Sequence, residues 1–290
     1  MNWFLLFRQS AGLILAGMLV NIGFGQDCHV TTVLRVLDKQ GRPVANLTAS
    51  QIKTEINGRP ASIGSFMPSA TPAVIIMLDE SGSMRDTWKE SIASARELLA
   101  NAGEDVALFV FGENIQDRAV GRANSEKLLD RWSSRVPWGG TAFYDALIEI
   151  ASKGGPGNAA IVLIGDGDDN KSAHTSDETK ALFLRSSWPP LFGLDVDHVR
   201  GGADYRKNGL KKIAASTGGF VSYPSSASEV SEAAKKLGVV VGNAYAVTLQ
   251  PSQPISHDAK LKMEIHGFRV LYPTEVAGCD RLPSPPTKTK

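Results

Sequence analysis

Ala73-Val74-Ile75-Ile76-Met77-Leu78-Asp79-Glu80-Ser81-Gly82-Ser83 is the stretch of the chain that decides the fold. It begins with a continuous apolar run, which is typical of a strand buried on both faces in a parallel sheet covered by helices. A polar loop containing a glycine follows the run directly. Because open α/β sheets hold their ligands at the carboxyl ends of the strands, this loop is a candidate binding site.

Strands and helices alternate downstream of this stretch. Further apolar runs at 106–111, 160–164 and 191–194 predict buried strands, and apolar residues at helical spacing predict helices near 88–99, 143–151 and 210–217. Ser226 followed by Glu229 is a capping-box pattern that predicts the start of a last helix. The alternation predicts an α/β fold with a doubly wound, mostly parallel sheet and helices on both faces.

The segments on either side of the predicted α/β unit resemble strands. We assign 26–68 to an N-terminal β segment, 73–242 to the α/β unit and 243–278 to a C-terminal β segment. The two β segments are expected to pair into one small β module. Residues 279–290 are rich in Pro, Thr and Lys and are expected to be disordered.

The first 25 residues have the features of a secretory signal peptide. Arg8 supplies positive charge, residues 11–20 form an apolar run, and Gly23 and Gly25 are small residues suited to a cleavage site. Cleavage would leave a secreted or periplasmic protein with no segment inserted in the membrane. An uncleaved anchor is the alternative.

Cys28 and Cys279 are the chain's two cysteines. Export would place them in a compartment where disulfides persist, and an even count fits one bridge. Two unpaired surface thiols are the alternative.

The charge balance argues against nucleic acid as a partner. Lys and Arg total 31 and Asp and Glu total 30, so the chain has no basic excess with which to neutralise a phosphate backbone.

Asp79, Ser81 and Ser83 form a D-x-S-x-S pattern in the loop after the first buried strand. If the loop curls at Gly82, one carboxylate and two hydroxyls converge on a point. An all-oxygen set suits a hard divalent cation, with Mg²⁺ preferred and Mn²⁺ or Ca²⁺ possible. The alternative is an ordinary loop in which Ser83 or Thr87 caps the following helix.

Two further loops carry oxygen side chains at the same predicted edge. Thr141 follows Gly139-Gly140 and precedes a predicted helix, and Asp166 follows the buried strand that ends at Gly165. With the first loop, they resemble the metal-ion-dependent adhesion site of von Willebrand factor type A domains. The resemblance covers roughly residues 73–242 and matches each position of the metal motif: Asp79, Ser81, Ser83, Thr141 and Asp166. Gly165 departs from the family, in which many members have Thr before the aspartate.

The resemblance implies a Rossmann-like fold and a function in protein binding and cell adhesion. By analogy with the family, Ser81 and Ser83 would bind the cation directly, Thr141 directly or through water, and Asp79 and Asp166 would orient bound water. A partner's carboxylate would fill the remaining coordination position. The flanking β segments are similar to those of exported bacterial von Willebrand factor A-related proteins.

Two other functions remain open at this stage. The cation would be structural if the chain were an assembly component of a cell-envelope complex. A metal-assisted hydrolase is disfavoured: Ser172 and His174 suggest a triad, but no glycine-flanked nucleophile elbow accompanies them. We therefore expect a binding protein and not an enzyme. Trp132 and Trp138 flank the Thr141 loop, either as part of a binding rim or as packed side chains.

Overall fold

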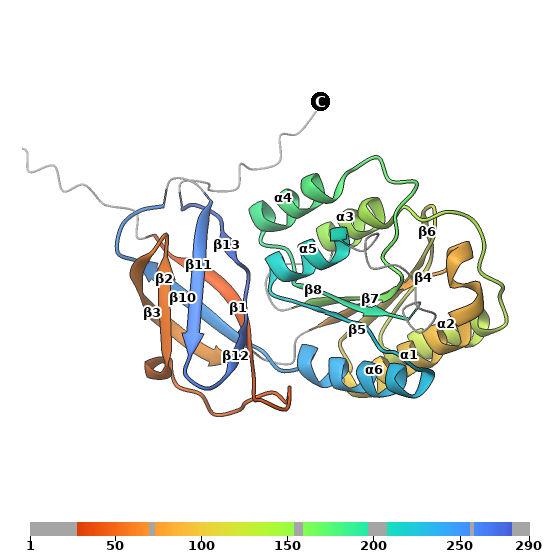
Figure 1. The fold of residues 1–290 in the computed structure, drawn as a ribbon, viewed down its shortest axis with the longest axis horizontal. Coiled ribbons are helices and arrows are strands. Elements are labelled where there is room, and N and C mark those ends of the chain that lie inside the picture. Colours follow the sequence, from red (N-terminus) through yellow and green to blue (C-terminus); the bar gives the residue numbers. More distant parts are fainter. Residues whose placement is uncertain (1–27, 70–72, 154–158, 197–207, 256–257, 280–290) are drawn as a thin grey trace, which may run out of the picture.

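The computed structural model describes residues 28–69, 73–153, 159–196, 208–255 and 258–279. Within them the chain forms two sheets, of six and seven strands, which lie beside each other in Figure 1. The expected signal peptide over 1–25 and residues 280–290 of the expected tail lie outside the described residues.

The first sheet, called the mixed sheet below, has the strand order β6-β5-β4-β7-β8-β9. Its strands are β4 (Val74–Asp79), β5 (Val106–Phe111), β6 (Ile115–Val120), β7 (Ala160–Gly165), β8 (Leu191–Asp195) and β9 (Val221–Ser222). The predicted strands β4, β5, β7 and β8 are confirmed, and they are parallel to one another. β6 pairs with β5 in the antiparallel direction at one edge.

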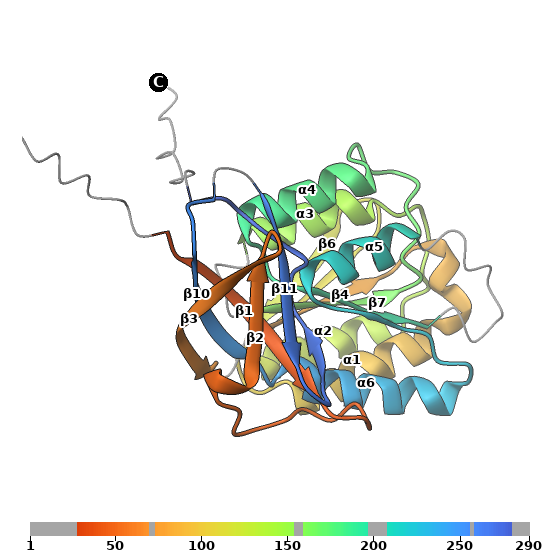
Figure 2. The same ribbon diagram turned by 60° about the vertical axis from the view of Figure 1, so that its left-hand side comes forward.

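Helices cover both faces of the mixed sheet (Figures 1 and 2). They are α1 (Trp88–Asn101), α2 (Arg122–Ser133), α3 (Phe143–Lys153), α4 (Ser176–Ser186), α5 (Asn208–Thr217) and α6 (Ala227–Val241). Alternate side chains of β4 explain this arrangement: Ile76 belongs to the apolar core shared with α1, α2 and α6, and Met77 to the core shared with α3, α4 and α5. A strand buried on both faces is apolar at successive positions, as β4 is from Val74 to Leu78.

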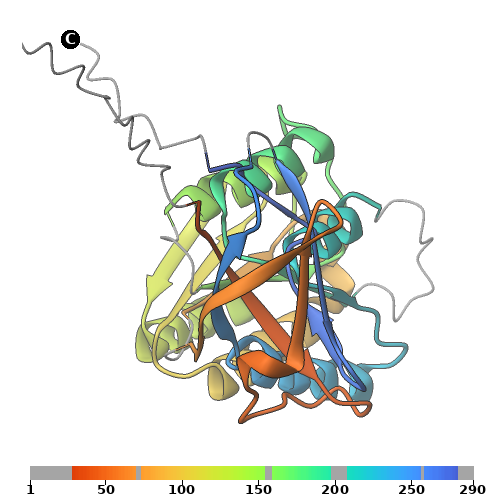
Figure 3. The same ribbon diagram turned by 90° about the vertical axis from the view of Figure 1, so that its left-hand side faces the viewer.

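The second sheet, called the antiparallel sheet below, is built from both ends of the described chain and has the order β12-β1-β10-β3-β2-β11-β13. Its strands are β1 (Val30–Leu37), β2 (Ile52–Ile56), β3 (Arg59–Pro68), β10 (Tyr245–Pro251), β11 (Ala259–Ile265), β12 (Arg269–Leu271) and β13 (Glu275–Val276), with the short helix η1 (Ala49–Gln51) before β2. β11 and β12 follow each other in the chain but lie near opposite ends of this order, so the sheet must curl. Figure 3 shows the orange early strands beside the blue late ones.

The predicted fold class is wrong. We expected a doubly wound, mostly parallel sheet with a small β module, but the larger sheet of the described residues is antiparallel and has seven strands. Two local features explain the error. β3 extends over ten residues and pairs with β10, which enlarges the antiparallel sheet, and the polar strand β6 makes the other sheet mixed.

The antiparallel sheet contacts the amino ends of the parallel strands. The Nη2 group of Arg35, on β1, donates a hydrogen bond to the carbonyl of Val241, the last residue of α6, at 3.2 Å. The same buried guanidinium lies 5.1 Å from the centre of the Phe192 ring, near the start of β8. The Thr274 amide donates to the Ser216 carbonyl in the last turn of α5 at 2.9 Å. The carboxyl ends of β4 and β7 therefore point away from these contacts.

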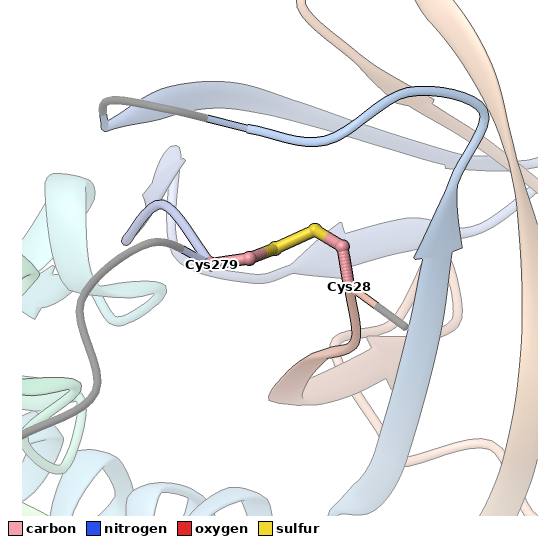
Figure 4. Close-up of a disulfide and its surroundings, with 2 residues drawn as sticks. All are labelled: Cys28 and Cys279. Atoms are coloured by element: carbon pink, nitrogen blue, oxygen red, sulfur yellow. A yellow bond between two sulfur atoms is a disulfide. The ribbon is translucent and has the colours of Figure 1, made fainter. Parts of the chain in front are cut away.

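Cys28 and Cys279 form a disulfide, as the even cysteine count predicted. Figure 4 shows the bridge between the segment before β1 and the segment after β13. The Cα atoms lie 5.4 Å apart across a sequence separation of 251 residues.

Of the helices in the described ranges, none has the length and apolar character needed to span a bilayer.

Candidate metal centre

The candidate centre lies where the central strands of the mixed sheet end. Asp79 is the last residue of β4, and Asp166 directly follows β7, the parallel neighbour of β4. The loop that carries Thr141 is tied to the end of the strand on the other side, because the Ala142 amide donates to the Gly112 carbonyl just after β5 at 2.8 Å. The topology thus brings the predicted loops to one edge of the sheet.

The first loop curls back on its own aspartate. The Ser81 amide donates to Asp79 Oδ1 at 2.9 Å, and the hydroxyl oxygens of Ser81 and Ser83 lie 3.1 Å apart. Asp79 and Ser81 are buried, whereas Ser83 is exposed at the start of the short helix η2 (Gly82–Thr87). The hydroxyl of the exposed Ser83 therefore meets that of the buried Ser81, in the loop that begins at the buried Asp79 carboxylate.

Backbone hydrogen bonds join the first loop to the second. The Gly82 amide donates to the Gly139 carbonyl at 3.1 Å, and the Trp138 amide donates to the Glu80 carbonyl at the same distance. Thr141 follows two residues after Gly139 and is buried. These bonds hold the segment before Thr141 against the Ser81–Ser83 turn.

The third loop holds Thr141 in place. The Thr141 amide donates to Asn170 Oδ1 at 3.0 Å, and the Thr141 carbonyl accepts from the amides of Asn170 and Lys171, also at 3.0 Å. Asp166, earlier in the same loop, is buried and accepts from the Asp168 amide through Oδ1 at 2.9 Å. A clamp around Thr141 therefore links the second loop to the third.

The electrostatics of the centre favour a bound cation. Burial, reinforced by repulsion from Asp166, raises the pKa of Asp79 to about 8. Asp79 Oδ2 is buried and accepts no hydrogen bond from the described residues. A buried carboxylate that lacks a partner is costly, and a nearby cation removes that cost. Burial also raises the pKa of neighbouring Glu80 to about 7, against the attraction of Arg135.

The donor set matches a hard cation. Two carboxylates and three hydroxyls offer oxygen atoms only, which suits Mg²⁺, Mn²⁺ or Ca²⁺. In the described ranges, no cluster of three or more His, Cys, Asp or Glu side chains is arranged to hold a metal. The candidate centre has two carboxylates and three hydroxyls, so it does not contain such a cluster. The observation that fits a cation here is the Asp79 oxygen that accepts no hydrogen bond from the described residues.

Sequence reasoning missed residues that support the centre without being candidate ligands. Asn170 acts through the backbone of Thr141, and no spacing rule marks such a role. Gly165 was noted only as a departure from the family, but a Cβ atom there would lie 2.7 Å from the Cβ of Asp79. The sequence signal for this requirement was the glycine itself, at the end of a strand that is otherwise fully apolar.

The side chains that suggested a hydrolytic triad bind elsewhere. The Ser172 hydroxyl donates to Asp169 Oδ2, and His174 Nδ1 lies 2.8 Å from Asp145 Oδ1. Asp145 also accepts from the backbone amides of Ala173 and His174. These contacts attach the third loop to the start of α3 and so serve to position it.

No protein-family model and no curated protein sequence matches this chain. Similar solved structures include an aerotolerance-related membrane protein from Bacteroides fragilis, with 18% identity over 57% of this chain and 97% of that chain and a TM-score of 0.43. The manganese-loaded TRAP protein of Plasmodium vivax has 12% identity over 76% of this chain and 96% of that chain, with a TM-score of 0.45. The pilus adhesin SpaC of Lactobacillus rhamnosus has 10% identity over 84% of this chain and 49% of that chain, with a TM-score of 0.44. Likenesses at this level carry no argument about the site.

Proposed function

We propose that this chain is a metal-dependent protein-binding module whose cation captures a carboxylate of a protein partner. The observation that carries the proposal is the pair of buried carboxylates, Asp79 and Asp166, with an Asp79 oxygen that accepts no hydrogen bond from the described residues, at the base of the loop that brings the hydroxyls of Ser81 and Ser83 together. The adhesion function that the sequence resemblance implies fits this arrangement.

Each candidate residue has a role that follows from its position. Ser81 and Ser83 present hydroxyl oxygens as direct ligands, and Thr141 contributes a third oxygen directly or through water. Asp79 and Asp166 orient the ligands: Asp79 already accepts from the Ser81 amide. A cation held mainly by neutral oxygens would keep positive charge and supply a coordination position for an acidic side chain.

The same arrangement favours binding over catalysis. His174 and Ser172 are engaged in holding the third loop, and Glu80 is buried beneath the centre. A general base must reach the proton that it removes. We therefore propose that the chain is not an enzyme.

We propose a secreted or periplasmic location. The Cys28–Cys279 disulfide supports it, because disulfides persist mainly outside the cytoplasm. We also propose a signal peptide at 1–25, an α/β unit at 73–242 and a β segment on either side of that unit.

The test compares Asp79→Ala and Ser81→Ala with the wild type. Calorimetric titration with Mg²⁺ and Mn²⁺ should show weaker cation binding in both variants, while far-ultraviolet circular dichroism shows a retained fold. Asp105→Ala is the matched control, because this exposed aspartate lies just before β5 at the amino end of the same sheet. Undiminished cation binding in both site variants would refute the site.

Partner capture is measured on the same proteins with and without chelator. The proposal expects capture to need the cation and to be lost in Asp79→Ala. Capture that persists in chelator would instead indicate a structural cation in an assembly component, with the partner bound on another surface.

A further inference from the structure

An apolar surface adjoins the candidate metal centre. Val136 and Trp138 are 64% and 72% exposed, and they are among the most exposed large apolar side chains of the described residues. Trp132, the other tryptophan near this loop, is instead partly buried against the core of the mixed sheet. An exposed tryptophan is uncommon on a surface that makes no contact, and it is often a binding anchor.

Trp138 lies directly beside the hydroxyl loop. Its amide donates to the Glu80 carbonyl, and its Cα atom lies 3.8 Å from the position that a Cβ on Gly82 would occupy. Gly82 stands between the two candidate serine ligands. A partner whose carboxylate reaches the cation would therefore place its neighbouring residue near Trp138.

The segment that exposes these side chains is anchored on both sides. Arg85 Nε lies 3.4 Å from the carbonyl of the buried Pro137 and donates to it. The Arg135 guanidinium lies 5.4 Å from the centre of the Trp132 ring, and the Trp132 carbonyl accepts from Trp88 Nε1 at 3.0 Å. The exposure of Val136 and Trp138 thus belongs to a fixed loop conformation, which lowers the entropy lost on binding.

The charges around this surface favour an acidic partner. Arg85, which donates to the Pro137 carbonyl, and Arg135, which precedes Val136, are both exposed. Among the nearby acids, Glu80 is buried, and Glu113 lies 3.8 Å from Lys171 and accepts from the Gly140 amide. Arg135 also attracts the buried Glu80, and the exposed Asp86 follows Arg85, but both guanidinium groups remain exposed, so their charge can attract a partner's acidic residues.

We infer that Val136 and Trp138, with Arg85 and Arg135, form a rim surface that selects the partner. This inference rests on the proposed function. The rim surface fits a polypeptide segment in which the acid that reaches the cation is followed or preceded by an apolar side chain, with further acids nearby. A membrane surface is disfavoured, because lipid binding uses a broad apolar face and this patch consists of two side chains.

The experiment selects peptides from a random library displayed on phage, using the full chain in Mn²⁺. Targets are the wild type, Trp138→Ser, Val136→Ser, Asp79→Ala and Val120→Ser. Val120 is the matched control: it is 68% exposed but pairs with Ala107 near the start of β5, at the opposite end of the sheet. Selected peptides are then synthesised and their affinities measured by fluorescence anisotropy.

On the wild type and on Val120→Ser, the selected peptides should share an acid next to an apolar residue. Trp138→Ser should bind them at least about tenfold more weakly, a loss of the size expected for a central aromatic anchor. Its Mn²⁺ affinity should be unchanged. Val136→Ser should show a smaller loss in the same direction.

The two proposals fail in different ways. Peptides that share an acid but no apolar neighbour, or that bind Trp138→Ser as tightly as the wild type, would overturn the rim surface and leave the proposed function intact. Peptides that bind Asp79→Ala or chelated protein equally well would overturn the proposed function. Two further outcomes would assign the rim surface to another occupant, if no peptides are selected. One is binding to phosphatidylglycerol vesicles that is lost in Trp138→Ser, and the other is a dimer, seen by analytical ultracentrifugation, that is lost in Trp138→Ser.

Discussion

Asp79 and Asp166 illustrate at the scale of single residues how the proposed binding site is costly for the fold. Both carboxylates are buried, and their repulsion adds to the effect of burial in raising the pKa of Asp79 to about 8. Without a cation, the folded protein holds a proton on Asp79 that the unfolded chain releases near its ordinary pKa of 3.8. The cation-free fold is therefore strained by its own ligands.

The first prediction is a pH effect on the cation-free protein. Between the ordinary pKa of 3.8 and about 8, the folded state binds more protons than the unfolded state. The free energy of unfolding contributed by Asp79 should therefore fall as pH rises through this window and level off above it. Urea denaturation in chelator at several pH values measures the fall.

Asp79→Asn is the control for this effect, because it removes the titrating group and keeps the shape. The variant should lose stability less steeply with pH than the wild type, and it should be the more stable of the two near pH 8. Parallel curves for the two proteins would show that Asp79 is not the group responsible.

The second prediction concerns Gly165. A Cβ at this position would meet the Cβ of Asp79 at 2.7 Å, closer than such atoms approach in folded proteins. Gly165→Ala should therefore destabilise the fold by about 1–3 kcal/mol, as overpacking of a core does, and weaken Mn²⁺ binding by displacing Asp79. Gly64→Ala is the steric control, because a Cβ there would meet only the Thr248 carbonyl oxygen, at an ordinary contact distance of 3.6 Å. Equal Mn²⁺ affinity in Gly165→Ala and wild type would contradict this account.

At the scale of elements, the centre depends on how its loops hold one another. Asn170 accepts the hydrogen bond of the buried Thr141 amide. The third prediction is that Asn170→Ala weakens cation binding about 10-fold, a loss typical of removing an outer contact that orients a ligand. Asn124→Ala is the control, since Asn124 donates to Val120 far from the centre. Calorimetric titration with Mn²⁺ measures the affinity of both variants. An equal loss of Mn²⁺ affinity in Asn170→Ala and Asn124→Ala would show that the effect is not local to the centre.

The elements differ in how far the sequence predicted them. β4, β5, β7 and β8 were predicted because strands buried on both faces leave continuous apolar runs. β6 was missed because an edge strand with half-exposed positions reads Ile-Gln-Asp-Arg-Ala-Val, without an apolar run. Its direction, which makes the sheet mixed, follows from a short connection after β5 and not from any residue pattern.

The size of the antiparallel sheet was also beyond the sequence. β3 is mostly exposed and includes Pro60, Gly64 and Pro68, so its local signal is weak. Its partner β10 follows the whole α/β unit in the sequence, and pairing between strands so far apart in the chain has no local sequence pattern. The residue types of the candidate centre were predictable from spacing, whereas the support from Asn170 depends on a contact that only the fold creates.

At the scale of the whole molecule, the antiparallel sheet and the candidate centre lie at opposite ends of the parallel strands. Arg35 contributes to the junction from β1, and burial lowers its pKa to about 10, so it stays charged at neutral pH. Its contacts with Val241 and Phe192 fix the sheet against the amino ends of the strands. The edge with the centre and the rim surface is left open to a partner.

The fourth prediction is that the disulfide stabilises the sheet and leaves the centre unaffected. Reduction of Cys28–Cys279 should lower the free energy of unfolding by about 2–4 kcal/mol, because the bridge restricts the unfolded chain. Mn²⁺ affinity should not change, since the centre lies at the carboxyl ends of β4 and β7, opposite the antiparallel sheet that the bridge closes. The Cys28→Ala/Cys279→Ala double variant, insensitive to reductant, is the control. A loss of Mn²⁺ affinity on reduction would contradict this separation.

β3 and β10 are hydrogen-bonded neighbours in which Pro68 stands opposite Tyr245, and the Ser69 amide donates to the Ala244 carbonyl. The chain therefore leaves the antiparallel sheet after β3 and returns to it at β10, the neighbouring strand. The α/β unit is inserted between these two adjacent strand ends. Replacing the α/β unit with another domain would therefore break no strand pairing of the antiparallel sheet in the described residues. It would, however, expose Arg35, Leu37 and Leu271, which contact that unit.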